Sequence, residues 1–156
     1  MLLPYIVCLF GHRQIENVIE VEAALRKMIG DILAEHEYVE FLIGREGEFD
    51  ILAASVIRKV TRRYDDGKCS LTLVMPYMRA DFEKNQSEYE AYYDSVELCE
   101  QSAAAHPKAA IRIRNRAMVD RADRCIFYVT HSSGGAYQTM KHAESTGKQI
   151  ISLDFS

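Results

Sequence analysis

The sequence predicts an α/β fold: a doubly wound, mainly parallel sheet of about five strands with helices on both faces. Two observations carry this prediction. Short apolar runs without polar alternation are typical of strands buried on both faces of a parallel sheet. These runs alternate with segments whose apolar residues recur at helical spacing, which indicates β-α-β units joined by right-handed crossovers.

The first half of the chain contains three expected strands and two expected helices. The strands cover 4–10, 39–43 and 70–75. The first helix places Val21, Leu25 and Ile29 on one face, and the second runs from Asp50 to about Val60. Asp50 is expected at the N-cap or in the first turn of that helix. A turn is expected at Asp66-Gly67, because this dipeptide favours turn conformations.

The second half begins with a polar, tyrosine-rich insert over 77–106. It is expected to contain a surface helix at 81–93 and a short strand at 95–99. A helix over 108–122 follows Pro107, and strands are expected at 125–129 and 149–153. A helix after the turn at 132–135 is expected to end at Gly147, which suits the left-handed conformation of a helix C-terminus.

Composition restricts the class of protein. The chain has 156 residues and a formal net charge of −4, which predicts one globular domain over 1–156 without a basic field for nucleic acid. No apolar stretch is long enough to span a membrane, and the apolar N-terminus lacks a basic signal-peptide region, so a cytoplasmic protein without membrane contact is expected. The cysteines and histidines form neither a CxxC nor an HxH or HExxH pattern, so no metal site is expected.

The carboxyl ends of the strands are where a ligand is expected. Ligands of open α/β sheets bind outside these ends, at the point where the strand order reverses. The residues that follow the first three strands and the strand at 125–129 should therefore converge. These residues are 11–13, 44–47, Tyr77 and 131–135.

The turn Ser132-Ser133-Gly134-Gly135 is the first candidate for phosphate binding. It precedes a helix, whose free N–H groups and dipole favour an anion. An ordinary strand-to-helix turn with a serine cap is the alternative. Neither a GxGxxG nor a Walker sequence is present, so the common dinucleotide and P-loop signatures do not apply.

The turn Gly11-His12-Arg13 is the second candidate. Arg13 could pair with a phosphate in bidentate fashion, and His12 could serve as a hydrogen-bond partner or an acid–base group. A solvated loop is the alternative. Among the arginines before the strand at 125–129, most are expected to be solvated, and Arg116, beside Asn115, is expected to face the ligand.

Four motifs, in this order, resemble the SLOG superfamily, the Rossmann-like group that contains the LOG and DprA proteins. They are Gly-His-Arg at 11–13, Gly-x-x-Gly-x-Phe-Asp at 44–50, the Arg-Asn-Arg-Ala-Met-Val-Asp sequence at 114–120, and Gly-Gly-Ala-Tyr-Gln-Thr at 134–139. The closest match is to the uncharacterised YpsA-like branch, over nearly the whole chain. The resemblance implies a Rossmann-like fold and a nucleotide-type ligand such as AMP, ADP-ribose or NAD. The residues expected to line or support its pocket are Gly11, His12, Arg13, Gly44, Arg45, Gly47, Asp50, Asn115, Arg116, Asp120, Ser132, Ser133, Gly134, Gly135 and Thr139.

The chain departs from the LOG enzymes at the residues that carry their chemistry. LOG enzymes cleave nucleoside monophosphates and end their Pro-Gly-Gly-x-Gly-Thr motif with a glutamate, but this chain has His142 at that position. No catalytic residue therefore carries over. Glu46 and Glu48 are the acidic candidates to replace the glutamate.

Three functions are compared on these grounds. Sensing of a bound nucleotide ranks first because the LOG glutamate is missing. Hydrolysis of a nucleotide N-glycosidic bond ranks second, since it requires a carboxylate in the pocket. Single-stranded DNA binding ranks third, and a nucleic-acid partner is not expected, because the net charge is negative and no basic groove with interleaved aromatic residues is evident. The tyrosines at 89, 92 and 93 could form a homo-oligomer interface or pack onto their own sheet.

Overall fold

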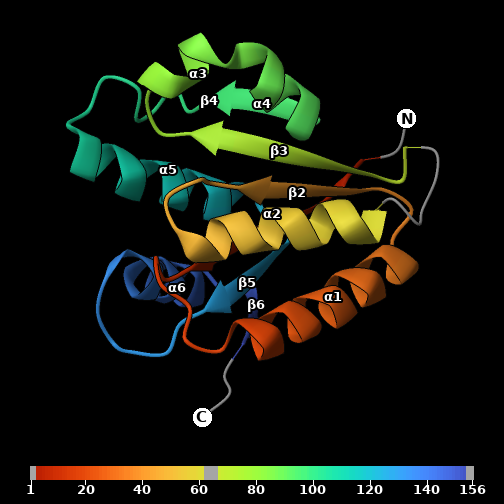
Figure 1. Ribbon diagram of the computed structural model, residues 1–156. Coiled ribbons are helices and arrows are strands. Elements are labelled where there is room, and N and C mark those ends of the chain that lie inside the picture. Colours follow the sequence, from red (N-terminus) through yellow and green to blue (C-terminus); the bar gives the residue numbers. More distant parts are fainter. Residues whose placement is uncertain (1–2, 62–66, 154–156) are drawn as a thin grey trace.

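The computed structural model describes residues 3–61 and 67–153 and contains one parallel β-sheet with helices on both sides (Figure 1). The strands are β1 (Tyr5–Gly11), β2 (Val39–Ile43), β3 (Cys69–Met75), β4 (Ser95–Leu98), β5 (Arg124–Tyr128) and β6 (Gln149–Ser152). The helices are α1 (Val18–Glu35), α2 (Glu48–Thr61), α3 (Ala80–Lys84), α4 (Gln86–Tyr92), α5 (Pro107–Arg121) and α6 (Gly135–Ser145). This is the predicted α/β architecture. The predicted turn at Asp66-Gly67 falls partly outside the described residues.

The sheet has the strand order β4-β3-β2-β1-β5-β6, and its described pairings are all parallel. Successive strands extend from β1 to β4 on one side, and the chain then returns to add β5 and β6 on the other. The order therefore reverses between β1 and β5, which is the place where such sheets bind ligands.

The sheet has six strands and not about five, because the short strand of the insert pairs with β3. Asp94 sets this pairing. Its backbone N–H donates to the Leu71 carbonyl at 2.9 Å, and its carboxylate accepts a hydrogen bond from the Leu71 N–H at 2.7 Å. A strand of four residues gives only a weak periodic signal in sequence, and this tertiary contact places it in the sheet.

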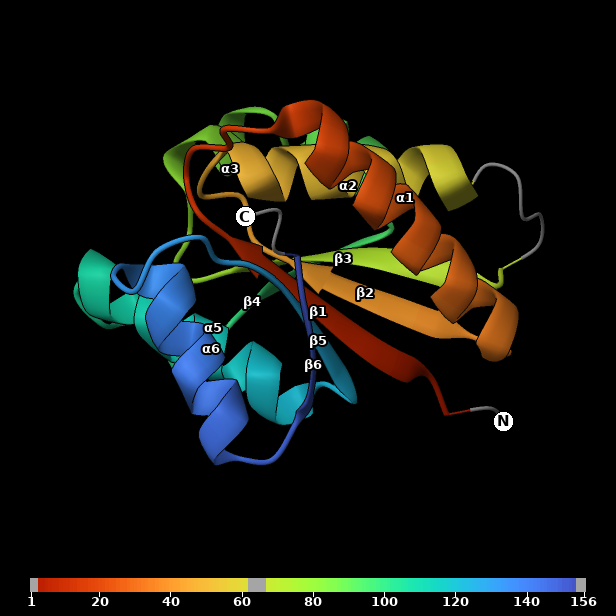
Figure 2. The same ribbon diagram turned by 90° about the horizontal axis from the view of Figure 1, so that it is seen from below.

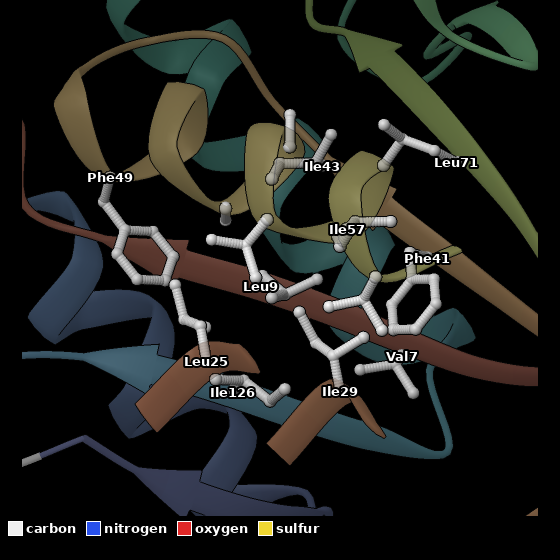
Figure 3. Packing of buried hydrophobic residues seen from close by; sticks show 14 of the residues in the cluster. Val7, Leu9, Leu25, Ile29, Phe41, Ile43, Phe49, Ile57, Leu71 and Ile126 are labelled. Atoms are coloured by element: carbon white, nitrogen blue, oxygen red, sulfur yellow. The ribbon is translucent and has the colours of Figure 1, made fainter. Parts of the chain in front are cut away.

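Helices cover both faces of the sheet: α1 and α2 lie on one side, and α5 and α6 on the other (Figure 2). The larger core lies under α1 and α2, where Leu25 and Ile29 pack against strand residues such as Val7, Leu9 and Phe41 (Figure 3). These side chains have at most 1% of their surface exposed in the folded protein. Since apolar burial is the main favourable contribution to folding, this layer anchors the loops that leave the strands.

The second core, under α5 and α6, contains two of the cysteines. Cys8 on β1 and Cys125 on β5 are register partners, and their sulfur atoms lie 3.3 Å apart. Both thiols are free and fully buried. Here cysteine packs as a small hydrophobic side chain.

The tyrosine-rich insert folds onto its own sheet. The expected helix at 81–93 is split into α3 and α4 at Asn85, whose N–H donates to the Asp81 and Phe82 carbonyls. Tyr89 and Tyr93 are buried in the main core, and Tyr92 is 38% exposed. The packing alternative therefore describes two of the three tyrosines. No helix among the described residues is long and apolar enough to cross a membrane.

Glycines at the first two strand-to-helix connections allow neighbouring segments to approach closely. A Cβ at Gly11 would overlap the Phe49 ring, and a Cβ at Gly47 would lie 2.5 Å from the Arg13 Cα. Gly30, inside α1, has no neighbour within 4 Å of the corresponding position.

We expect Gly11→Ala and Gly30→Ala to change stability in opposite directions. The added methyl group at position 11 must displace a buried ring and should cost about 1–3 kcal/mol of unfolding free energy. At position 30 it should add roughly 0.5–1 kcal/mol, because alanine favours a helix interior over glycine. Urea unfolding of the three proteins measures both effects. Equal stability of wild type and Gly11→Ala would contradict the packing described for Phe49.

Candidate functional site

A pocket of about 460 Å³ opens at the carboxyl edge of the sheet, next to the position where the strand order reverses. The loops after β2 and β5 lie together on the left of Figure 1, at this edge. The residues that line the pocket come from the end of β1, from the loops after β1, β2 and β5, and from α2, α5 and α6. They are Leu9, Phe10, Gly11, His12, Arg13, Gln14, Glu16, Gly44, Glu46, Asp50, Ile111, Arg114, Asn115, Thr130, His131, Gly134, Gly135 and Ala136.

The pocket is built around Arg114, whose side chain is only 2% exposed. Its guanidinium group donates to the Val74 carbonyl at 2.8 Å and to the Asn115 Oδ1 at 2.9 Å. The same group forms an ion pair with Glu46 at 3.0 Å. It also fills the space where a side chain at position 44 would point, since a Cβ at Gly44 would lie 3.0 Å from the Arg114 Nη1. One cation thus joins α5, the end of β3 and the loop after β2.

Most arginines of this segment were expected to be solvated, and Arg116 was expected to face the ligand. The structure instead buries Arg114 at the pocket and leaves Arg116 exposed outside it. Arg114 continues the buried stripe that Ala110 and Met118 form at a spacing of four residues along α5, a pattern that the sequence contains. Arg116 is exposed and lines a separate groove formed by α5 and the segment around β4.

The acidic candidates have different surroundings. Glu46 lies in the pocket wall, where Arg114 and Arg79 neutralise its carboxylate at 3.0 and 3.4 Å. Glu48 is exposed and lies outside the pocket lining; its carboxylate accepts a hydrogen bond from the Ile15 N–H at 2.8 Å. Glu48 therefore links the first two strand-to-helix connections and does not face a ligand.

Asp50 also lines the pocket. It lies in the first turn of α2, and its Oδ2 accepts a hydrogen bond from the Glu46 N–H at 2.9 Å. Burial raises the pKa of Asp50 to about 6, although that hydrogen bond and the Arg114 charge both favour ionisation. The negative charge of the pocket therefore decreases in mildly acidic solution.

His12 and His131 form a stacked pair in the pocket wall, with ring centroids 3.7 Å apart. The Thr130 N–H donates to His12 Nε2 at 2.9 Å, which requires that nitrogen to be unprotonated. Burial and the neighbouring His131 lower the pKa of His12. His12 is thus a neutral ring near pH 7. It is buried, whereas the His131 ring that stacks on it is exposed to solvent.

The N-terminus of α6 points into the pocket through Gly134 and Gly135. Gly134 adopts a φ of +90°, a conformation that favours glycine, and no side chain caps the helix. No heavy atom lies within 4 Å of the Cβ position at Gly135. The first N–H groups of α6 are therefore open to an anion.

The other predicted residues of this turn and of α6 lie outside the pocket lining. Ser133 hydrogen-bonds to the His131 ring at 3.2 Å, and Ser132 is exposed. Thr139 is buried, donates to the Gly135 carbonyl at 2.8 Å and accepts from Asn115 at 3.3 Å. These contacts tie α6 to α5 behind the open helix end.

Arg13 is the exposed cation of the pocket. Its backbone carbonyl accepts a hydrogen bond from the Glu48 N–H at 2.9 Å, and Gly47 packs against its Cα. Its guanidinium group has no ion pair among the described residues. The backbone is therefore held while the guanidinium charge, which also acts on the Asp50 carboxylate, stays exposed to solvent.

Two further predicted residues lie outside this pocket. Arg45 lines a neighbouring pocket, and Asp120, at the other end of α5, pairs with His142 at 2.9 Å.

We expect Arg114→Met to be strongly destabilising. The substitution keeps the length of the side chain but removes its charge. Arg79 then remains as the cationic partner of Glu46, and the Val74 carbonyl and the Asn115 Oδ1 lose their hydrogen bonds from Arg114. We expect a cost of about 3–5 kcal/mol of unfolding free energy. Arg112→Met, at an exposed position of the same helix, should stay within about 0.5 kcal/mol of wild type. Urea unfolding of both variants measures the difference; similar stabilities would show that the buried cation does not hold the loops.

We also expect Asp50→Asn to change how stability depends on pH. The folded pKa of Asp50 lies above its ordinary value of 3.8, so the native state binds the proton more tightly than the unfolded chain. Wild type should therefore lose stability relative to the variant as pH rises from about 4 to about 6, by on the order of 2 kcal/mol. Unfolding midpoints of both proteins across this range provide the measurement. A constant difference would contradict the raised pKa.

Comparisons with known proteins identify the fold. No family model matches the chain, and no curated protein matches it. The X-ray structure of DNA processing protein A (DprA) from Streptococcus pneumoniae is similar, with a TM-score of 0.71 and 14% identity over 98% of this chain. A second DprA structure, from Helicobacter pylori, has a TM-score of 0.68 and 14% identity over 98% of this chain. The chain spans 51% and 66% of the length of these two proteins.

These neighbours correct the ranking of functions made from the sequence. The Helicobacter pylori structure is described by its single-stranded DNA binding mode. Placing nucleotide sensing first, and expecting no nucleic-acid partner, was therefore wrong. The error came from using the net charge of −4, which averages the whole surface and does not describe the cations at one edge. The comparisons agree with the SLOG resemblance at the level of the fold and do not distinguish its YpsA-like branch. This chain has the Rossmann-like fold of the DprA proteins.

Proposed function

We propose that this protein binds single-stranded DNA and that a backbone phosphate occupies the pocket between Arg13 and the N-terminus of α6. One observation carries the proposal: an exposed arginine that forms no ion pair with the described residues and an open helix end line the same pocket at the reversal point of the sheet. The fold similarity to proteins that include a single-stranded DNA binder gives the ligand class.

Both groups suit a phosphodiester. A phosphate oxygen at the start of α6 would accept hydrogen bonds from backbone N–H groups that have no partner inside the helix. Arg13 would supply the cationic fork on the other side of the same phosphate. These contacts read the backbone and not the base, so they support binding with little dependence on sequence.

The pocket wall also offers a surface for an unpaired base. The His12–His131 stack is aromatic, and His131 is exposed. Stacking of bases on flat side chains is the usual second component of single-strand binding and requires no particular base. A base paired in a duplex could not reach this surface, which favours single strands over double strands.

We expect Arg13→Ala and Gly135→Asp each to weaken binding of single-stranded DNA by roughly tenfold or more, since each removes a charge-assisted contact with phosphate or opposes it. Arg13 is exposed and the space at Gly135 is open, so both variants should fold. Arg26→Ala removes the same charge from an exposed position on α1 and serves as the control. Fluorescence anisotropy with an oligothymidine about 12 nucleotides long gives the affinities.

The outcomes separate this proposal from its alternatives. Unchanged affinity in both site variants would show that the phosphate does not bind in this pocket. A wild-type protein that binds NAD or ADP-ribose but no oligonucleotide would overturn the proposed function. Equal affinity for duplex and single strand would contradict the role of the unpaired base.

A further inference from the structure

A second pocket, of about 510 Å³, adjoins the first along the carboxyl edge of the sheet. The two share Arg13, Glu46 and Ile111 as lining residues. The second pocket extends from this shared wall toward the end of β3 and the start of α3. Its remaining lining residues are Arg45, Tyr77, Met78, Arg79, Ala80 and Asp81.

Arg45 is the unusual group in this second pocket. It is half-buried, its Nη1 donates to the Tyr93 hydroxyl at 3.0 Å, and its Cζ lies 5.2 Å from the centre of the Tyr89 ring. Among the described residues it has no ion pair with any carboxylate. Burial opposes the charge of the guanidinium group, but the two tyrosines hold it in its charged form and raise the pKa of Arg45. Because no carboxylate among the described residues neutralises it, an external anion at this pocket would meet an unmatched positive charge.

Arg79 has a different part in the same pocket. Its guanidinium group pairs with Asp81 at 3.1 Å and with Glu46 at 3.4 Å, and it donates to the Arg45 backbone carbonyl at 3.4 Å. Its charge is thus already matched, and its contacts hold the backbone of Arg45 in place. In the part of the chain that the structure describes, two cations of this edge have no acidic partner: Arg13 in the shared wall and Arg45 beyond it.

The second pocket also contains side chains that suit a base. Tyr77 is half-buried, and Met78 is 46% exposed. An aromatic ring and a flexible apolar side chain next to an unpaired cation are the components with which proteins hold one nucleotide of a single strand.

We propose that the second pocket is a further nucleotide subsite, in which Arg45 binds the phosphate adjacent to the one at Arg13 and Tyr77 packs against the base. The inference rests on the proposed function and extends it. The ligand class becomes a single strand with at least two phosphates, which runs along the carboxyl edge from the loop after β5 toward the end of β3.

The first experiment measures how wild-type affinity depends on ligand length and on salt. The probes are thymidine monophosphate and 5′-phosphorylated oligothymidines of two, four and eight nucleotides. We expect affinity to rise by tenfold or more between the monophosphate and the four-nucleotide strand. With two phosphates contacted, the logarithm of the binding constant should fall against the logarithm of the salt concentration with a slope of about −1.4.

The second experiment removes the charge of the new subsite. Arg45→Gln keeps a hydrogen-bonding side chain near Tyr93, and near-ultraviolet circular dichroism of the tyrosines verifies that the insert remains folded. We expect the variant to bind the monophosphate as wild type does, to lose most of the gain from length, and to show a slope of about −0.7. Arg26→Gln, at an exposed position of α1, is the matched control and should resemble wild type.

Different results would contradict the proposed function and the second subsite. If no probe of any length binds, the proposed function is wrong. If oligonucleotides bind but affinity does not increase beyond the monophosphate, or Arg45→Gln keeps the full gain and slope, the second subsite is overturned and the site at Arg13 remains.

Discussion

The architecture of the carboxyl edge depends on one buried cation. Arginine stays charged in proteins, so Arg114 can be buried only if several acceptors surround it. The Val74 carbonyl and the Asn115 side chain accept its hydrogen bonds, and the Glu46 carboxylate supplies the opposite charge. These groups come from three segments of the chain. This requirement fixes the position of α5 relative to the end of β3 and to the loop after β2. It also explains why position 44 is a glycine, since the guanidinium group occupies the space of a side chain there.

Around this centre, the charges of the edge are matched selectively. The two adjoining pockets are lined by four arginines and by four acids, so the edge as a whole is close to neutral. Within it, Arg114 and Arg79 have acidic partners, whereas Arg13 and Arg45 have none among the described residues. An anion would therefore bind at Arg13 or Arg45 and would not be attracted by an overall positive field. Net charge describes long-range attraction, but it does not describe a short-range site of this kind.

The sequence predicted the elements well because their signals are local. The apolar runs of β1, β2, β3 and β5 marked buried strands, and the position of Gly147, with a φ of +72°, was recognised from helix-ending preferences. The rule that ligands bind at the carboxyl ends of parallel strands brought Gly11, Arg13 and Gly135 into one predicted site, and the structure places them in one pocket. The rest of the site depends on which way individual side chains point. Arg116 and Glu48 lie close in sequence to pocket residues but outside the pocket lining, because adjacent helical positions differ by about 100° in direction.

The sequence by itself therefore determined the fold class, the edge of the sheet at which the candidate pocket lies, and the glycine-rich turn at the start of α6. These follow from periodicity and from residues whose backbone preferences act locally. Only the tertiary structure decided that Arg114 is internal, that β4 joins the sheet, that Gly11 and Gly47 accommodate neighbouring segments, and that Arg45 faces the pocket beyond Arg13. The physical reason is the same in each case. Burial, ion pairing and close packing depend on contacts between residues that are distant in the chain, and a local pattern does not contain that information.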